Sequence, residues 1–409
     1  KHIPVPNEML VHFRRAGLES LLHYTARVQR STVFRGRHLI VGGSTAVEAI
    51  GPSAVVADVS GIAIANLPAW VEKHFFEPGR EISAMTEWEP KLAAIAARTR
   101  AKDIAVVAGL PTALLALAEV ALRERGNGNG ATARLSTLWP TLECLVHGGL
   151  SLGPFGDELR QLAGNGVSFH EVYPSAEGFI AAQDADASAG LRLMTDTGLF
   201  FEFVPLADFQ ESHLDTVSAK AVPLEGAKVG VDYALLLTAP SGLCRYITGD
   251  IVRLLNLDPP RLVYCGQTRL LLSAWGERVT ERELTGALTL TCQRHQWRTV
   301  NFHVAPLPAG PGGGRHEWWL ELKPGTVETP KGPAIAAELD DEIQRHNALY
   351  RAKRKGGQLQ EPVVRLVMPG VFEQWARQRG RWGGHGKTPR SRPDRQIADE
   401  LAKLSPFSP

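Results

Sequence analysis

The chain has 409 residues, which exceeds the ~100–200 residues typical of one domain and favours two or three hydrophobic cores. Hydrophobic residues make up 44% of the sequence and charged residues 22%, a globular composition that excludes a disordered chain and a fibre. The 45 basic residues nearly balance the 43 acidic ones, giving a net charge of +2. This balance argues against a general electrostatic grip on nucleic acid or on a membrane, so any preference for an anion must come from a local cluster.

The cysteines and the longest apolar stretch bear on where the protein works. The four cysteines are far apart and form no CxxC pair, which argues against a disulfide framework and favours a reducing compartment, the cytoplasm. The most apolar stretch, residues 104–122, is interrupted by Pro111 and Glu119. We therefore expect a buried strand followed by a helix there, and no membrane span.

The first two thirds of the chain alternate short apolar runs with helical patterns. Residues 37–41 predict a buried strand that ends at Gly42, and residues 87–100 have apolar side chains at helical spacing. Residues 103–107 return to a strand, and Pro111 begins the next helix, since proline fits a first helical turn. This alternation is typical of an α/β fold in which helices cover a parallel or mixed sheet.

From residue 199 the predicted strands lie closer together. Residues 200–204 and 232–238 are two of them, and a Pro-Ser-Gly turn leads from the second into a strand at residues 244–246. Strands joined by short turns favour a small antiparallel subdomain beside the main sheet.

A smaller α+β region follows. Residues 300–304 and 317–322 flank a glycine-rich turn at residues 310–314, and this pattern predicts a hairpin. Apolar residues at four-residue spacing from residue 335 predict a helix that closes after Lys355 at a pair of glycines. The coarse prediction is a large α/β domain followed by a smaller α+β domain.

Residues 42–46, Gly-Gly-Ser-Thr-Ala, follow the first predicted strand and faintly resemble the serine elbow of hydrolases. That elbow needs a second glycine two residues after the serine, and Ala46 stands there instead. No sequence feature designates the acid and histidine partners of Ser44. A structural turn is the better interpretation, and a serine hydrolase centred on Ser44 is the alternative.

Seven arginines and lysines crowd a glycine-rich segment between residues 377 and 395. One interpretation is a mobile loop that places a cation against a phosphate or a developing oxyanion. A solvent-exposed tail is an equally good interpretation on composition alone.

Two short segments offer groups that suit a nucleotide. Residues 173–178, Tyr-Pro-Ser-Ala-Glu-Gly, combine an aromatic ring, a hydroxyl and the Glu177 carboxylate, which suits Mg²⁺. Capping of a helix is the ordinary alternative for this segment. Residues 246–250, Tyr-Ile-Thr-Gly-Asp, end in Asp250, whose carboxylate accepts hydrogen bonds either from ribose hydroxyls or from its own backbone in an Asx turn.

In this order and at this separation, the two segments resemble those of adenylate-forming enzymes. More narrowly, the chain resembles the Gretchen Hagen family of acyl acid–amido synthetases, in its shorter bacterial form. Further stretches that carry the resemblance lie at residues 109–111, 138–143, 147–149, 200–205, 243–250, 276–277, 369–372 and 387–390. The resemblance spans nearly the whole chain, and its specificity comes from the ordered set.

The resemblance implies a large adenylate-forming-type domain over residues 1–268, with mixed sheets, helices and the small antiparallel subdomain, and a smaller mobile α+β domain over residues 269–409. It implies an ATP-dependent ligase that joins a small carboxylic acid to an amine, usually an amino acid, through an acyl-adenylate. Two chemical steps divided between two conformations explain a small domain on a hinge. ATP and Mg²⁺ are the expected cofactors, and neither nucleic acid nor a membrane is an expected partner.

The resemblance also assigns roles to residues. Glu177 would hold Mg²⁺, and Lys387 on the glycine-rich loop would reach the phosphates, which makes these two the catalytic residues. Gly148 and Gly149 would border the adenine, and Tyr173 would stack on it. Asp250 would bind the ribose hydroxyls, and Ser175 and Ala176 would lie at the α-phosphate. Arg269, the last of the nucleotide-binding residues, would lie at the hinge. The acyl group would lie against Leu110, Phe200 and Phe201.

Three departures from the family pattern bear on activity. Ala176 stands where the family usually has a hydroxyl residue, and Gln267 stands where related sequences often have arginine. The Ser/Thr/Gly-rich phosphate loop would fall just upstream of Lys1, so we expect the sequence to lack that N-terminal part. A catalytically degenerate member that binds a small acid or a partner is the alternative that these departures favour.

Overall fold

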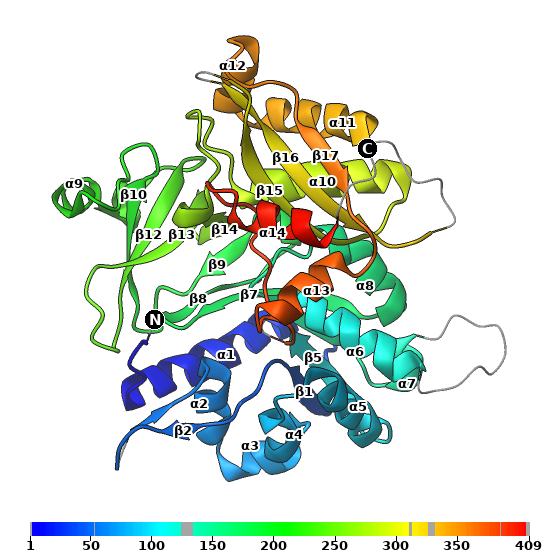
Figure 1. Cartoon of the computed structure of the whole chain (residues 1–409). Helices are drawn as coiled ribbons and strands as arrows, with labels where there is room; N and C mark the ends of the chain where they lie inside the picture. Colours follow the sequence, from blue (N-terminus) through cyan, green and yellow to red (C-terminus); the bar gives the residue numbers. More distant parts are fainter. Residues whose placement is uncertain are drawn as a thin grey trace.

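The computed structural model describes residues 2–52, 54–123, 134–310, 313–325, 332–384 and 386–405. Within these residues the main feature is a sheet of twelve strands in the order β11-β10-β12-β13-β14-β9-β8-β7-β6-β5-β1-β4. Figure 1 shows a smaller domain, coloured yellow to red, stacked on the domain that contains this sheet. The arrangement confirms the predicted α/β class with a smaller C-terminal domain.

One half of the large sheet is parallel and alternates with helices. The parallel strands are β4 (Phe76–Glu77), β1 (Arg37–Val41), β5 (Ile104–Gly109), β6 (Cys144–Gly148) and β7 (Ser168–Ser175). The helices of this half are α1 (Asn7–Arg27), α2 (Val59–Ala65), α3 (Ala69–His74), α4 (Arg80–Ala84), α5 (Trp88–Thr99), α6 (Pro111–Arg123), α7 (Leu135–Leu138), η1 (Gly153–Phe155) and α8 (Gly156–Ala163). A two-residue pair, β2 (Glu48–Ala49) and β3 (Val55–Val56), lies outside the sheet.

The apolar stretch at residues 104–122 folds as the predicted strand and helix. Ile104 and Val107 of β5 are fully buried, and Pro111 begins α6. Both strand residues share a core cluster with Leu114 of α6, so the stretch is buried in protein. In the part of the chain that the structure describes, no helix is long and apolar enough to cross a membrane.

The other half of the large sheet is antiparallel. Its strands are β8 (Gly178–Ala182), β9 (Leu191–Leu193), β10 (Phe200–Pro205), β11 (Val222–Pro223), β12 (Asp232–Thr238), β13 (Tyr246–Leu257) and β14 (Pro260–Gln267). Short helices accompany them: η2 (Ala187–Ala189), α9 (Leu214–Lys220), η3 (Leu224–Gly226) and η4 (Thr268–Leu270). The predicted antiparallel subdomain continues the main sheet, because β7 pairs with β6 in parallel on one side and with β8 in antiparallel on the other.

The strand expected at residues 244–246 begins only at Tyr246. Arg245 has a φ of +47°, a left-handed conformation that breaks an extended strand. Its guanidinium group donates from Nε to Oε2 of Glu202 at 3.0 Å. The turn therefore extends through residue 245, and the hydrogen bond from Arg245 to Glu202 stabilises it.

The smaller domain contains a three-stranded sheet between two pairs of helices. Its elements are α10 (Glu281–His295), β15 (Thr299–Pro308), β16 (Gly314–Leu322), α11 (Gly332–His346), α12 (Ala348–Lys355), β17 (Val363–Leu366), α13 (Val371–Gln378) and α14 (Gln396–Leu404). The predicted hairpin is confirmed as β15 and β16, although Pro311 and Gly312 of its turn lie outside the described residues. Adjacent residues of β16 face opposite sides: Trp318 packs with α10 and α11, and Trp319 packs with α13 and α14.

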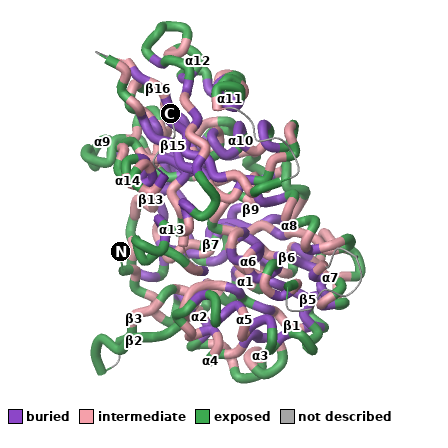
Figure 2. Tube along the Cα trace, turned by 45° about the vertical axis from the view of Figure 1, so that its right-hand side comes forward, coloured by how far each residue is buried: buried purple, intermediate pink, exposed green. Residues whose placement is uncertain are grey.

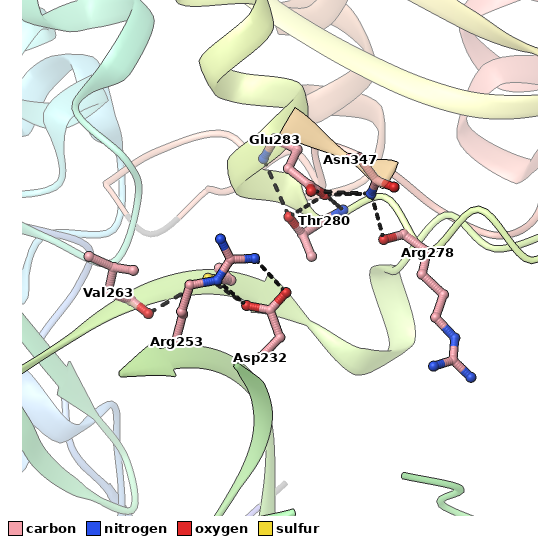
Figure 3. A network of polar contacts seen from close by, with 8 residues as sticks. Asp232, Arg253, Val263, Arg278, Thr280, Glu283 and Asn347 are labelled. Atoms are coloured by element: carbon pink, nitrogen blue, oxygen red, sulfur yellow. Dashed lines mark hydrogen bonds and ion pairs between the residues drawn. The ribbon is translucent and has the colours of Figure 1, made fainter. Parts of the chain in front are cut away.

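The single helix expected between residues 335 and 355 is two helices, divided at Asn347. The side chain of Asn347 accepts from the backbone N–H of Tyr350 at 2.8 Å and caps α12. Its Nδ2 also donates to Glu283 Oε1 at 3.1 Å, and Glu283 forms a capping box with Thr280 at the start of α10. Figure 3 shows this network, which joins the starts of α10 and α12 close to the antiparallel sheet.

Polar side chains join the two domains. Nζ of Lys323, just after β16, donates to Glu119 of α6 and to Glu158 of α8, at 2.8 Å each. Gln293 of α10 donates to Asp157 of α8 at 3.1 Å. Figure 2 shows that buried residues follow the strands of both sheets, whereas exposed residues gather at α9 and at the β2–β3 pair.

Candidate active site

Several predicted site residues lie where neighbouring parallel strands end. Leu110 follows β5, Gly148 ends β6, and Tyr173 lies near the end of β7. Because β5, β6 and β7 are adjacent and parallel, their carboxyl ends meet at one edge of the sheet. In open α/β sheets, ligands bind outside the carboxyl ends of the strands. This edge is therefore the candidate active site.

Tyr173 and Asp250 meet at this site from the two halves of the sheet. The Tyr173 hydroxyl donates to Oδ2 of Asp250 at 2.5 Å, and Nε2 of Gln267 donates to Oδ1 at 3.3 Å. Burial, reinforced by the Asp250 carboxylate, raises the pKa of Tyr173 well above its ordinary value, so the hydroxyl stays protonated. The Tyr173 ring belongs to a core cluster, and its stacking on adenine stays a prediction.

Asp250 lies in a bulge inside β13, where a strand end or an Asx turn was expected. Between residues 247 and 251 the strand shifts register against β12. Gly249 has a φ of +87°, which favours glycine, and the backbone N–H of Asp250 donates to Thr248 Oγ1 at 3.0 Å. The bulge sets the direction of the Asp250 carboxylate toward Tyr173.

The glycine-rich C-terminal loop brings Lys387 to Gly149. A Cβ added to Gly149 would lie 2.9 Å from both Nζ of Lys387 and Cδ2 of Leu110, and the φ of Gly149 is +73°. The protein around the ammonium group lowers the pKa of Lys387, although the residue is exposed, while the nearby carboxylates of Glu281 and Asp250 raise it. Lys387, Glu281 and Asp250 therefore form one charged cluster beside Gly149.

Glu281 and Arg390 belong to this cluster, although neither was predicted as a site residue and Arg390 was noted only as one of the basic residues of the glycine-rich segment. Burial raises the pKa of Glu281, and the positive charges of Arg390 and Lys387 lower it. Burial lowers the pKa of Arg390 to about 10, against the influence of Glu281. The Arg390 guanidinium lies over the rings of Phe155 and Phe302, 5.4 Å and 4.8 Å from their centroids. These cation–π contacts hold Arg390 in the core, three residues after Lys387.

Glu177 lies in the tight turn between β7 and β8. The residue is 2% exposed, and Oγ of Ser175 donates to the Gly178 carbonyl at 3.2 Å across the turn. A strand follows, so helix capping is the wrong interpretation of this segment. Ala176 occupies the turn without a hydroxyl group. The turn keeps the Glu177 carboxylate at the end of the strand that carries Tyr173.

The contacts of the described residues do not bring Arg269, Phe200 or Phe201 into this cluster. The exposed Arg269 side chain forms an ion pair with Glu211, in which Nε donates to Oε2 at 3.2 Å. Phe201 is buried in the core of the antiparallel half, and Phe200, the preceding residue of β10, is exposed. The hinge role of Arg269 and the acyl-binding role of the two phenylalanines stay predictions.

Ser44 lies in a turn after β1. Its Oγ donates to the Ala84 carbonyl at 2.7 Å and accepts from the backbone N–H of Ala46 at 3.2 Å. Among the described residues, no imidazole forms a hydrogen bond with this hydroxyl. The contacts favour the structural turn, and the serine hydrolase alternative has no support.

Gly148→Ala is expected to lower the free energy of unfolding by about 1–3 kcal/mol, because overpacking against a fixed neighbour costs that much. The added Cβ would lie 2.2 Å from the Val172 carbonyl oxygen, a backbone atom of the paired strand β7. Urea denaturation measures the change. Gly286→Ala is the matched control, since no atom lies within 4 Å of its added Cβ and alanine favours a helix. Equal stabilities of the two variants would contradict the prediction.

Comparisons with known proteins agree with the motif pattern. The GH3 family central domain matches residues 192–267, and the GH3 family C-terminal domain matches residues 282–396. The indole-3-acetic acid-amido synthetase GH3.10 of Arabidopsis thaliana is 31% identical over 166 residues, which cover 37% of this chain and 27% of that protein. The indole-3-acetic acid-amido synthetase GH3.3 of the same plant is 24% identical over 305 residues, which cover 69% of this chain and 50% of that protein. The chain thus spans half or less of the length of these curated relatives.

Solved structures share the fold. The AtGH3.15 acyl acid amido synthetase in complex with 2,4-DB superposes with a TM-score of 0.71 at 18% identity, over 100% of this chain and 80% of that chain. A 2-hydroxyisobutyryl-CoA ligase in the postadenylation state superposes with a TM-score of 0.58 at 15% identity, over 97% of this chain and 72% of that chain. The resemblance to the GH3 (Gretchen Hagen) family that the motifs indicate is therefore confirmed, since residues 192–267 and 282–396 match the central and C-terminal domains of that family.

Proposed function

We propose that the protein is an ATP-dependent ligase that joins a small carboxylic acid to an amine, usually an amino acid. In the first step the acid carboxylate attacks the α-phosphorus of ATP, and pyrophosphate leaves. In the second step the amine attacks the acyl carbon of the acyl-adenylate, and AMP leaves as the amide forms. The observation that carries the proposal is the approach of Lys387 to Gly149 at the end of β6, beside Asp250. The amido synthetases to which the chain is similar support this chemistry.

The residues at the strand ends fit a nucleotide. A side chain at Gly148 or Gly149 would meet neighbouring protein atoms at short distance, so glycine lets the chain pass close to its neighbours there, and we assign both residues to the adenine. The Asp250 carboxylate, directed by its bulge, suits the hydroxyls of a ribose. Ser175 and Ala176 lie in the turn after β7, and we assign them to the α-phosphate. Arg269 would act at the hinge, when the smaller domain moves.

The first step crowds negative charge, because a carboxylate must approach a triphosphate. The Lys387 ammonium group would offset this charge. Electrostatic stabilisation of this kind is usually the largest single contribution that an active site makes to the rate. Mg²⁺ would supply further positive charge at the phosphates, and Glu177 is the residue proposed to hold it. One carboxylate suffices, since Mg²⁺ usually keeps several waters and takes its other ligands from the phosphates.

Three further assignments belong to this proposal. The boundary between the domains is placed at residues 268 and 269, directly after β14. Leu110, Phe200 and Phe201 are proposed to contact the acyl group. The cytoplasm is the proposed compartment, because the four cysteines are free thiols.

Release of pyrophosphate tests the proposed function. We expect release only when ATP and a carboxylic acid are both present, and formation of an amide when an amino acid is added. Glu177→Gln is expected to slow release by more than about 100-fold, because it removes the carboxylate proposed to bind the metal ion. Glu225→Gln, at an exposed position in η3, is the matched control. A protein that binds no ATP would overturn the proposal.

A further inference from the structure

A cavity of about 390 Å³ lies between the start of α5 and the glycine-rich loop that follows α13. One wall contains Ser44, Trp88 and Lys91, and the other contains Arg381 and Lys387. Its volume suits a small organic molecule. Lys387 also lies at Gly149, so the cavity and the candidate active site share this residue.

The charges on the cavity wall have one sign. Of the described residues that line it, three are basic, namely Lys91, Arg381 and Lys387, and none is acidic. The rest of the wall includes the indoles of Trp88 and Trp382. A ligand that carries an anionic group on an apolar body matches this lining.

Lys91 is the cation that the protein holds most firmly. Only 2% of the residue is exposed, and its Nζ donates to the carbonyls of Gly43 and Ser83 at 2.6 Å each. An ammonium group has three donors, and no described residue accepts from the third. No described carboxylate pairs with it, and burial lowers the pKa of Lys91 to about 8. A buried charge without a counter-charge is costly, so an anion in the cavity would be bound favourably there.

The cavity exists because the glycine-rich loop lies directly on the first domain. A Cβ on Gly384 would lie 2.4 Å from the carbonyl carbon of Gly42 and 2.6 Å from a ring atom of Trp88. Nε1 of Trp382 donates to Glu89 of α5 at 2.8 Å. These contacts keep the two walls together, so a ligand in the cavity contacts both domains.

We propose that this cavity is a carboxylate subsite of the ligase, in which Lys91 is the fixed cation. The inference rests on the proposed function. The proposed reaction uses a carboxylic acid, and its second substrate also carries a carboxylate when that substrate is an amino acid. Both substrates present the same chemistry to Lys91. The side-chain indoles would contact the apolar part of either substrate.

Equilibrium binding without ATP tests the subsite separately from the proposed activity. The probes are 3-phenylpropanoate, its neutral amide 3-phenylpropanamide, L-phenylalanine and 2-phenylethylamine, and isothermal titration calorimetry gives each Kd. We expect Lys91→Met to weaken binding of at least one carboxylate probe by about 10-fold or more, the value of a hydrogen bond to a charged group. Lys102→Met, at an exposed position after α5, is the control and should change no Kd.

The pattern among the probes identifies the substrate. Weaker binding confined to 3-phenylpropanoate assigns the subsite to the acid, and weaker binding confined to L-phenylalanine assigns it to the acceptor. The neutral amide and the amine should bind equally to the wild type and to Lys91→Met. If Lys91→Met does not fold, Arg381→Glu takes its place, since it reverses a charge on an exposed residue of the same cavity. It should weaken the binding of at least one carboxylate probe.

Two results would overturn the subsite. One is an unchanged Kd for both carboxylate probes in Lys91→Met, or in Arg381→Glu where that variant replaces it. The other is the absence of saturable binding of either carboxylate probe to the wild type. If ATP-dependent pyrophosphate release fails while Lys91-dependent carboxylate binding persists, the proposed function is wrong and the subsite stands.

Discussion

Lys387→Met is expected to slow ATP- and acid-dependent pyrophosphate release by about 100-fold or more, the loss typical when one fixed donor to a developing anion is removed. The Lys387 ammonium group is the cation that the C-terminal loop carries to Gly149. Methionine keeps much of the side-chain volume and removes the charge. The expected change is therefore in the rate of the first step, with little change in the melting temperature.

The control for this variant is Lys403→Met, an exposed position in α14 of the same domain. Because surrounding protein lowers the pKa of Lys387, its charge is lost at a lower pH than that of an ordinary lysine, and the wild-type rate should decline there as pH rises. Release by Lys387→Met within threefold of the wild type would remove Lys387 from the mechanism.

Glu277→Ala is expected to lower the free energy of unfolding by about 3–5 kcal/mol, because it leaves a buried imidazole and a buried backbone N–H without their acceptor and opens a cavity. Oε1 of Glu277 accepts from Nε2 of His316 at 3.1 Å, and both side chains are fully buried. Oε2 accepts from the backbone N–H of Trp275 at 2.8 Å. The loss combines an unpaired imidazole, an unpaired N–H and a cavity.

The pH dependence of this loss follows from the pKa of Glu277. Burial raises that pKa, but the hydrogen bond and charge of His316, together with backbone N–H groups, hold it below its ordinary value of 4.5. A carboxyl group with a lowered folded pKa stabilises the fold above its unfolded pKa and loses this contribution as pH falls through the folded value. The difference between wild type and Glu277→Ala should therefore shrink below pH 4.5, measured by urea denaturation.

Glu277→Gln is the control for size, since the amide oxygen still accepts from Trp275. The free energy of unfolding of Glu277→Gln should lie between those of the wild type and Glu277→Ala. Equal stability of the alanine variant and the wild type would show that the Glu277–His316 pair makes no net contribution.

Elements with a strong local pattern were predicted from the sequence. The strands at residues 37–41 and 232–238 correspond to β1 and β12, and Pro111 begins α6 as expected. Local pattern failed where one side chain redirected the backbone. Arg245 delays the start of β13 through its left-handed conformation, and Asn347 divides a helix by capping its second half.

The candidate site was predicted only in part, because its residues meet through long-range contacts. The motifs marked Tyr173 and Asp250, and the structure joins them by a hydrogen bond. The Thr-x-x-Glu pattern at residues 280–283 marks the start of a helix, yet nothing in it indicates that Glu281 lies near Lys387. Lys91 shows the same limit, since its partners are backbone carbonyls that leave no trace in composition.

The strand β7 has a consequence for how the protein can be divided. It is the last parallel strand of the large sheet, and the turn after it leads into the first antiparallel strand. A fragment that ended at this turn would leave one long side of β7 with unpaired backbone groups, which readily pair with other chains. The same turn carries Glu177. The residue proposed to bind the metal ion thus lies at the junction of the two halves. Neither half alone contains the candidate site, since Tyr173 comes from β7 and its partner Asp250 from β13.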